Sequence, residues 1–248
     1  MPDSWLLVAV GSLAAFFVGL SKGGLALIGA LGVPILALII SPVRAAAVLL
    51  PVYVLSDMAG LWAYRREFSR ENLRILIPAS AAGVGIGWAM ASHVSDRGVG
   101  LLVGVIGLVF CWNSWRRRHE PEAASPASVP RGIAWGLVTG FSSFVSHAGQ
   151  PAYQVYVLPQ RLPKMVYAGT TTILFAVTNT LKLLPYWALG QLSADNLRIA
   201  LYLALPALAG TLLGVRLVQV LPQRSYFRIV QVLLFAVSVR LVIKAAGV

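Results

Sequence analysis

Acidic residues, cysteine and histidine are scarce in this sequence. Only 8 of the 248 residues are Asp or Glu, against 20 Lys and Arg, and charged residues make up 11% in all. Soluble domains carry about 25% charged residues. A hydrophobic content of 58% and a mean hydropathy of +0.79 therefore predict an integral membrane protein. The single cysteine, Cys111, lies in an apolar run, which excludes a disulfide framework and a thiolate metal site.

Catalytic and nucleotide-binding motifs are also missing. The sequence contains no nucleophile elbow, no His-Glu-x-x-His and no P-loop, and its three histidines are scattered. We therefore expect no enzyme, no metal site and no cofactor. The excess of basic residues gives a net charge of +12, but these residues separate apolar runs, as topology signals do. This arrangement does not favour nucleic acid as a partner.

Ten apolar segments are predicted to be helices, because they lack the alternating polarity of barrel strands. A linker rich in Pro, Ser and charge, 116–131, separates them into two groups of five. We predict a first transmembrane repeat over 1–115, a cytoplasmic linker over 116–131 and a second transmembrane repeat over 132–248. The segments cover about 5–20, 25–40, 45–64, 73–92, 99–115, 132–147, 151–160, 165–189, 197–219 and 226–247.

The two groups are related by sequence. Asn72-Leu-Arg-Ile75 recurs as Asn196-Leu-Arg-Ile199, and several Gly and Pro positions recur in the same order. Five segments in each half would invert the second half relative to the first, and most basic residues then fall on the linker's side. We predict an all-α polytopic membrane protein with two homologous halves in inverted repeat and about 8–10 transmembrane segments.

The first two segments of each half look too short to cross a membrane. Residues 151–160 would extend about 15 Å as a helix, against a hydrocarbon thickness of about 30 Å. We therefore expect a broken or re-entrant helical hairpin in each half, with its break near the membrane midplane. Short helices in a locally thinned bilayer are the alternative.

A lysine interrupts the first hairpin, in Gly19-Leu-Ser-Lys-Gly-Gly24. Placing lysine at the bilayer centre costs about 3 kcal/mol, so it normally faces a cavity or a partner. Ser21 adds a hydroxyl group, and Gly23 and Gly24 permit close approach of backbone N–H groups to a ligand. We predict that an anion binds at these residues together with Lys22. The alternative is that Lys22 snorkels to the membrane surface.

The matching place in the second half reads Ser146-His-Ala-Gly-Gln-Pro151. Paired polar, glycine-containing breaks in two related halves point to the substrate site of a transporter. Because the donors here come without carboxylates, they suit an oxyanion. We predict that Ser146, His147, Gly149 and Gln150 belong to the substrate site. The alternative for His147 is a histidine satisfied by neighbouring backbone.

Asp57 is the one acidic residue well inside an apolar run; its counterpart in the second half is Asn179, with Lys182 one turn further on. An intramembrane carboxylate is a candidate coupling site for a proton or a cation, with Asn179 and Lys182 as secondary candidates. A structural ion pair with Lys22 or Lys182 is the alternative, because a buried carboxylate needs some partner. The three threonines at 170–172 are interpreted as helix-packing residues.

Several short motifs together carry a resemblance to a known family. They are Gly19-Leu-Ser-Lys-Gly-Gly24, Asp57 with Gly60-Leu-Trp-Ala-Tyr-Arg65, His147-Ala-Gly149, Leu158-Pro-Gln-Arg-Leu-Pro-Lys164 and Tyr186-x-Ala-Leu-Gly190. With these motifs the chain resembles the sulfite exporter TauE/SafE family, also called the four-toluene sulfonate uptake permease (TSUP) family. The resemblance implies a bacterial inner-membrane carrier with two related halves, and sulfite, sulfoacetate or other organosulfonates as substrates. This chain departs from the family at Leu25-Ala-Leu-Ile-Gly29, where members often have more glycine, and at Gln150, where a second glycine is common.

We therefore expect a secondary transporter, an exporter of small sulfur-containing oxyanions such as sulfite or sulfoacetate-like organosulfonates, coupled to an ion. Its expected partners are the lipid bilayer, a small anionic substrate and a coupling proton or sodium ion, and a homodimer is left open. An anion channel that uses the same basic site is one alternative. A non-transporting membrane scaffold or assembly protein, in which Lys22 and Asp57 form a structural pair, is another.

Overall fold

The computed structural model describes residues 4–91, 93, 95–116 and 124–246, and the predicted linker residues 117–123 lie outside them. Every regular element in the described residues is a helix, so the prediction of an all-α protein is confirmed. All ten predicted segments contain a helix. The helices are α1 (Ser4–Lys22), η1 (Ala26–Leu31), α2 (Gly32–Leu36), α3 (Pro42–Tyr64), α4 (Arg70–Ala89), α5 (Asp96–Arg116), α6 (Val129–Ser146), α7 (Gly149–Val157), η2 (Leu158–Gln160), α8 (Lys164–Ala188), α9 (Ala194–Val220) and α10 (Gln223–Ala246).

Five of the described helices are long and apolar enough to cross a membrane: α1, α3, α5, α9 and α10. The expectation that the first segment of each hairpin is too short to cross a membrane is wrong for α1, whereas α6 is not among these five helices. Helix α1 has 19 residues and α6 has 18, which at 1.5 Å per residue is about 27–29 Å. Only the returning parts are short, since η1 and α2 have 6 and 5 residues and α7 has 9.

The repeated Asn-Leu-Arg-Ile motif lies at the start of a helix in both halves. Ser69 caps α4 by accepting a hydrogen bond from the Asn72 backbone N–H, and Ser193 caps α9 by accepting one from the Asn196 backbone N–H. A serine N-cap satisfies one of the four backbone donors that a helix leaves unpaired at its start. The repeated motif therefore corresponds to the same local structure in each half.

The described chain forms two compact units, and these units are not the two sequence halves. The first unit takes Met1–Phe68 and Ala168–Leu221, and the second takes Ser69–Tyr167 and Pro222–Val248. Each unit therefore contains helices from before and after the linker. The inverted orientation of the halves and the repeat boundaries at 115 and 132 stay predictions.

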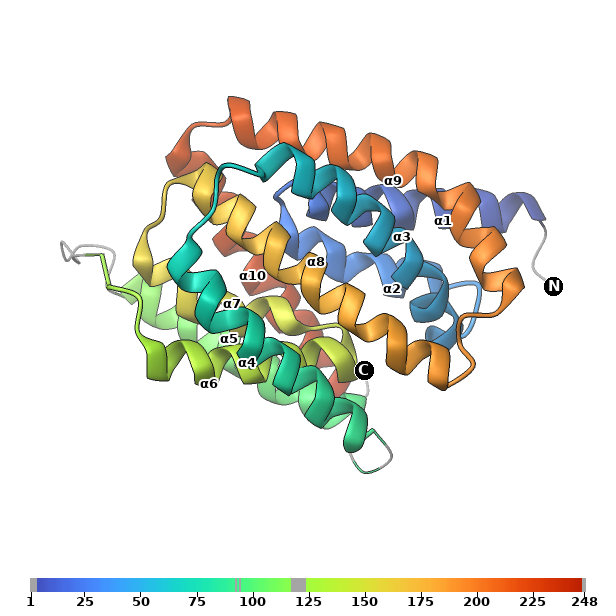
Figure 1. Ribbon diagram of the computed structural model, residues 1–248, viewed down its shortest axis with the longest axis horizontal. Coiled ribbons are helices and arrows are strands. Elements are labelled where there is room, and N and C mark those ends of the chain that lie inside the picture. Colours follow the sequence, from blue (N-terminus) through green and yellow to red (C-terminus); the bar gives the residue numbers. More distant parts are fainter. Residues whose placement is uncertain (1–3, 92, 94, 117–123, 247–248) are drawn as a thin grey trace. The chain divides into compact units, whose positions relative to one another are not determined.

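In the first unit, α1 packs along α9, as the blue and orange helices of Figure 1 show. Glycine permits this close crossing, because a Cβ atom at Gly19 would overlap with the carbonyl group of Ala207, and one at Gly210 would overlap with that of Phe16. Small residues allow helix backbones to approach in this way inside membranes. The apolar core beside the crossing is formed by α1, α2, α3 and α9.

In the second unit, α4 packs along α6 through an equivalent crossing. A Cβ atom at Gly83 would overlap with the carbonyl group of Leu137, and one at Gly140 would overlap with that of Ser80. Helices α5 and α10 form the other long contact of this unit. These two pairs position the second hairpin, since α7 packs against both α6 and α5.

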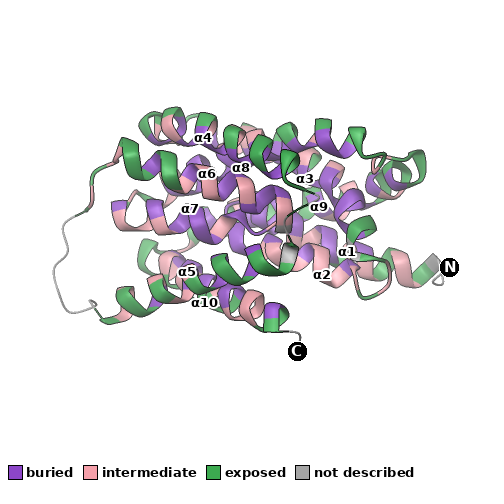
Figure 2. Cartoon of the chain, turned by 90° about the horizontal axis from the view of Figure 1, so that it is seen from below, coloured by how far each residue is buried: buried purple, intermediate pink, exposed green. Residues whose placement is uncertain are grey.

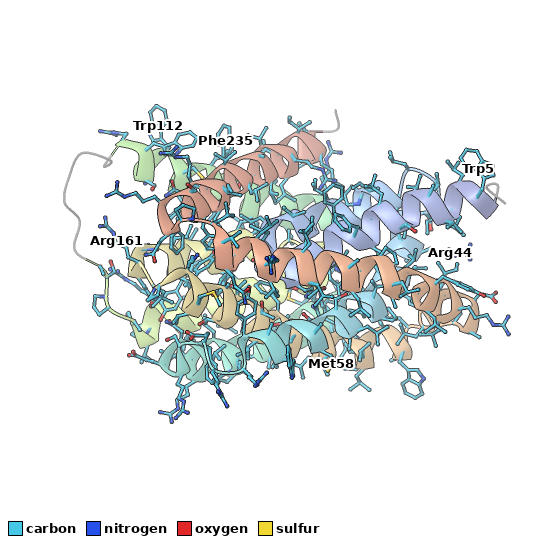
Figure 3. All side chains as sticks on the ribbon, turned by 90° about the horizontal axis from the view of Figure 1, so that it is seen from above. Trp5, Arg44, Met58, Trp112, Arg161 and Phe235 are labelled. Atoms are coloured by element: carbon cyan, nitrogen blue, oxygen red, sulfur yellow. The ribbon has the colours of Figure 1, made fainter. Side chains whose placement is uncertain are left out.

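Large apolar side chains also cover the outer faces of several helices. Figure 2 shows exposed and buried residues on opposite faces along many of them. Trp5 and Trp112 are 68% and 63% exposed, and Figure 3 shows both side chains pointing away from the helices. Exposed apolar faces of this kind suit contact with lipid rather than water.

Candidate functional site

Helix α3 presents four functional candidates on one face. Tyr53, Asp57, Gly60 and Tyr64 follow one another at intervals of four, three and four residues, which places them in one row along the helix. All four lie in the first compact unit. The aspartate that sequence reasoning singled out is therefore flanked by a tyrosine one turn before it and a glycine one turn after it.

Helix α8 contributes a second row to the same unit. Thr172, Asn179 and Lys182 are separated by seven and three residues, so they share one face of α8. All three side chains are buried. Asn179 and Lys182, the secondary candidates, therefore lie on the same buried face of α8.

The end of α1 is held against both of these rows. A Cβ atom at Gly60 would lie 2.8 Å from the carbonyl oxygen of Lys22 and 2.7 Å from the methyl group of Thr172. Thr172 donates a hydrogen bond of 3.3 Å to the same Lys22 carbonyl oxygen. The Tyr64 hydroxyl donates one of 2.6 Å to the carbonyl oxygen of Gly23. Three helices therefore fix the backbone that carries Lys22, and the interpretation of Thr172 as a packing residue is confirmed.

Lys22 forms a buried ion pair with Asp57. The Lys22 Nζ atom lies 2.8 Å from Asp57 Oδ1, and the two side chains are 7% and 1% exposed. The Asn179 amide donates a 2.9 Å hydrogen bond to the second oxygen, Asp57 Oδ2. The Lys22 ammonium also lies 4.9 Å from the centre of the Tyr53 ring, in a cation–π arrangement. The snorkelling alternative for Lys22 is therefore wrong, and the ion pair weighed for Asp57 is present.

A second lysine makes the charges of this cluster unequal. Lys182 is 2% exposed and interacts electrostatically with both Lys22 and Asp57. With all three groups ionised, two buried ammonium groups face one buried carboxylate. The hydroxyl of Ser56, the residue that precedes Asp57 in sequence, is buried and has no hydrogen-bond partner among the described residues. Because buried charge needs compensation, one further anion would neutralise the cluster in this ionisation state.

The other predicted residues of the first hairpin are used mainly within the protein. The Ser21 hydroxyl donates a 2.6 Å hydrogen bond to the carbonyl oxygen of Val18, one turn earlier in α1. The N–H groups of Gly23 and Gly24 donate to carbonyl oxygens of α1, at 2.9 and 3.2 Å. Gly24 has a φ of +114°, a conformation that favours glycine. In this structure the glycines therefore end α1 and admit close packing, and their contact with a substrate stays a prediction.

The second hairpin lies in the second compact unit. Helix α6 ends at Ser146, whose side chain is outside the described part of the structure. His147 follows with a φ of +53°, in the left-handed region, and α7 restarts at Gly149. The broken hairpin predicted here is therefore present. The backbone N–H of Ala148 donates a 3.2 Å hydrogen bond to the carbonyl oxygen of Ser142 across the break.

Two glutamines follow the break on one face of α7. The side-chain oxygens of Gln150 and Gln154 are buried without a hydrogen-bond partner among the described residues. The two residues are one turn apart, and Gln154 is almost completely buried. The structure brings Lys22, Asp57, Asn179 and Lys182 together in the first unit, and it describes Gly149 and Gln150 separately in the second. That both hairpins contribute to one substrate site stays a prediction.

Sequence reasoning missed one residue of the first-unit cluster, Tyr53, whose ring contacts the Lys22 ammonium group. Tyr53 was not a candidate, although its position one turn before Asp57 on a helix places it on the same face. For Tyr53, the spacing to the one intramembrane aspartate was the usable signal.

A model of the sulfite exporter TauE/SafE family matches residues 7–241, nearly the whole chain. The chain belongs to the TauE/SafE family. The resemblance inferred from the sequence motifs is thereby confirmed, and the match includes both hairpins and the Lys22–Asp57 pair. No curated protein and no solved structure shows a significant match. TauE/SafE proteins are membrane transporters, which agrees with the five helices of span length and with the buried charges.

Proposed function

We propose that this TauE/SafE protein is a secondary transporter of small sulfur-containing oxyanions, such as sulfite or a sulfoacetate-like organosulfonate, and that it exports them across the bacterial inner membrane. The family supports transport of such anions. The observation that carries the proposal for this chain is the buried cluster in which Lys22 and Lys182 face the single carboxylate of Asp57. When Lys22, Lys182 and Asp57 are all ionised, the cluster carries one excess positive charge, which favours an anionic ligand.

The Asp57 carboxylate occupies the position on Lys22 that a substrate oxyanion would take. A protein carboxylate and a sulfur oxyanion both accept short hydrogen bonds from an ammonium group. When Asp57 is ionised, Lys22 is paired internally at 2.8 Å. When Asp57 binds a proton, it loses its charge, and both lysines then need an external anion. This competition between a proton-sensitive carboxylate and the substrate supplies a coupling mechanism.

Coupling through Asp57 predicts a specific transport phenotype for Asp57→Asn. The variant keeps the shape of the side chain but cannot bind or release a proton. In proteoliposomes we expect it to lose uphill transport of sulfite driven by an ion gradient, while it retains exchange of labelled sulfite across the membrane. Equal loss of uphill transport and exchange, at normal yield of folded protein, contradicts the coupling role.

The substrate class is tested by ligand-dependent stabilisation of the purified protein. The ligands are sulfite, sulfoacetate, taurine, sulfate, thiosulfate, phosphate and acetate, each measured with wild type, Lys22→Ala and Lys182→Ala. Lys244→Ala, at an exposed lysine near the end of α10, is the matched control. A ligand at a hundredfold excess over its Kd stabilises a protein by about 2.7 kcal/mol. We expect a sulfur oxyanion to stabilise wild type and the control, and to lose this effect in both cluster variants.

A membrane scaffold is the second candidate function, because Lys22 and Asp57 already satisfy one another in the structure. Under that hypothesis no anion stabilises the protein, and simultaneous replacement of Lys22 and Asp57 by apolar residues leaves its function intact. An anion channel predicts flux that follows voltage and does not saturate at low substrate concentration. Saturable, gradient-coupled flux favours the transporter over both.

A further inference from the structure

The second compact unit contains a cavity of about 730 Å³ that is separate from the Lys22–Asp57 cluster. It lies between the C-terminal part of α5, the N-terminal part of α10 and the η2 turn that follows α7. Three kinds of residue line it: two arginines, a set of uncharged polar residues, and an apolar set. They are Arg161 and Arg224; Asn113, Ser114, Ser125, Gln223 and Gln231; and Phe110, Leu158, Pro159 and Phe227.

The charged side chains that line this cavity are both positive. Arg161 and Arg224 line it, and its described lining contains no acidic residue. Arg224 is the second residue of α10, a helix of 24 residues, so the positive end of the helix dipole adds to the two guanidinium groups. Arginine binds phosphate through paired N–H donors. The polar part of the cavity therefore suits a phosphate-type oxyanion.

The remainder of the lining is apolar, which a free inorganic anion does not need. Phe110 and Phe227 come from α5 and α10, and Leu158 and Pro159 come from η2. A ligand that satisfies both parts has an anionic head and an apolar body. Ser114 and Gln231, which share a 3.4 Å hydrogen bond, tie α5 to α10 within the lining.

The position of the cavity also points to a lipid. Helices α5 and α10 are both long and apolar enough to cross a membrane, and they pack against each other. The cavity lies where α5 ends, near Asn113, and where α10 begins, at Gln223. The ends of membrane-spanning helices lie at the boundary between hydrocarbon and water. Arg161, which follows η2 and is labelled in Figure 3, is exposed on this unit.

We propose that this cavity binds an anionic phospholipid. The phosphate of the head group lies at Arg161 and Arg224, and the part of an acyl chain nearest the head group lies against Phe110 and Phe227. Basic pockets between transmembrane helices are suited to such head groups. This inference goes beyond the proposed transport of sulfur oxyanions, since all of its residues lie in the second unit and none belongs to the Lys22–Asp57 cluster.

The test compares lipid binding by three forms of the purified full chain in detergent. They are the wild type, the double variant Arg161→Gln/Arg224→Gln, and the control Arg70→Gln/Arg74→Gln. The control removes the same number of exposed arginines of the second unit outside the cavity. Each is titrated with phosphatidylglycerol, with phosphatidylcholine and with inorganic phosphate, and the Kd is measured from native mass spectra and thermal stabilisation.

We expect phosphatidylglycerol to bind the wild type and the control alike, and to bind the double variant about 25-fold more weakly, at about fivefold for each arginine. If the double variant folds poorly, Arg224→Gln alone replaces it, because the Arg224 side chain is exposed in the first turn of α10. We expect this single variant to bind phosphatidylglycerol about fivefold more weakly than the wild type. Equal phosphatidylglycerol affinity in all forms overturns the site. Stabilisation by inorganic phosphate equal to that by phosphatidylglycerol overturns the lipid and leaves a soluble anion as the occupant.

Discussion

The unequal charges of the first-unit cluster predict that its two ion-pair partners contribute unequally to stability. Asp57 is paired with Lys22 at 2.8 Å and also interacts with Lys182. When both lysines are ionised, Asp57→Asn preserves the volume of the side chain but leaves two buried ammonium groups without a carboxylate. Lys22→Met preserves most of the volume of the lysine, and the Lys182 ammonium group then remains to balance the Asp57 carboxylate. The aspartate variant should therefore be the more destabilised of the two.

The magnitudes follow from the burial of the groups. Removing one partner of a buried ion pair costs about 3–5 kcal/mol when the other charge is left uncompensated. This estimate applies to Asp57→Asn. In Lys22→Met the Asp57 carboxylate retains the 2.9 Å hydrogen bond from Asn179 and the nearby charge of Lys182. The loss there is one charge-assisted hydrogen bond, about 1.5–3 kcal/mol.

The assay is thermal unfolding of each variant in the same detergent, with and without the best-stabilising anion. One kcal/mol corresponds to about 2–4 °C in the unfolding midpoint of a chain of 150–250 residues. We expect Asp57→Asn to unfold several degrees below Lys22→Met. A bound oxyanion should restore more stability to Asp57→Asn than it adds to the wild type, because it replaces the missing charge. Equal destabilisation of the two variants, or a larger loss in Lys22→Met, would refute this charge-balance reasoning.

Two further predictions concern the packing of the helices. Gly19→Ala should sharply reduce folded yield, because its Cβ atom would overlap with the Ala207 carbonyl group. Gly85→Ala should be neutral or stabilise α4 by up to about 1 kcal/mol, because its Cβ atom would meet no atom within 4 Å outside its own stretch of helix. The yield of detergent-solubilised protein in size-exclusion chromatography measures both effects. Asn72 and Gln160 exchange two buried amide hydrogen bonds of 2.8 and 3.1 Å. Alanine at either residue should cost about 1–3 kcal/mol and the double variant less than the sum of the two; additive losses in a double-mutant cycle would show that the pair does not interact.

The helices and the chemical candidates were predictable from the sequence, because apolar length and isolated intramembrane charge are local signals. The length of α1 was not. The sequence places Gly19 and Ser21 in a predicted break, yet the helix continues to Lys22. The glycine there is explained by the close crossing with α9, and a crossing between residues distant in sequence leaves no local pattern.

The ion-pair partner of Asp57 also could not be predicted from the residues near it in sequence. The sequence left Lys22 and Lys182 as alternatives, and both lysines are near the carboxylate in the structure. Which of them forms the short contact depends on how closely the end of α1 approaches α3. That approach depends on Gly60, whose missing side chain leaves room for the Lys22 backbone. Periodicity identifies the face of each helix, but only the packed helices determine the pairing.

The two compact units explain why the charge cluster requires both sequence halves. In one unit the hairpin helix α1 packs on α9, and in the other the hairpin helix α6 packs on α4, so each hairpin helix is covered by a helix from the opposite half. The same exchange occurs within the cluster, where Lys22 and Asp57 precede the linker, and Asn179 and Lys182 follow it. Neither half alone contains both the carboxylate and its second lysine. The excess positive charge on which the proposed anion binding depends therefore arises only when the helices of the two halves pack together.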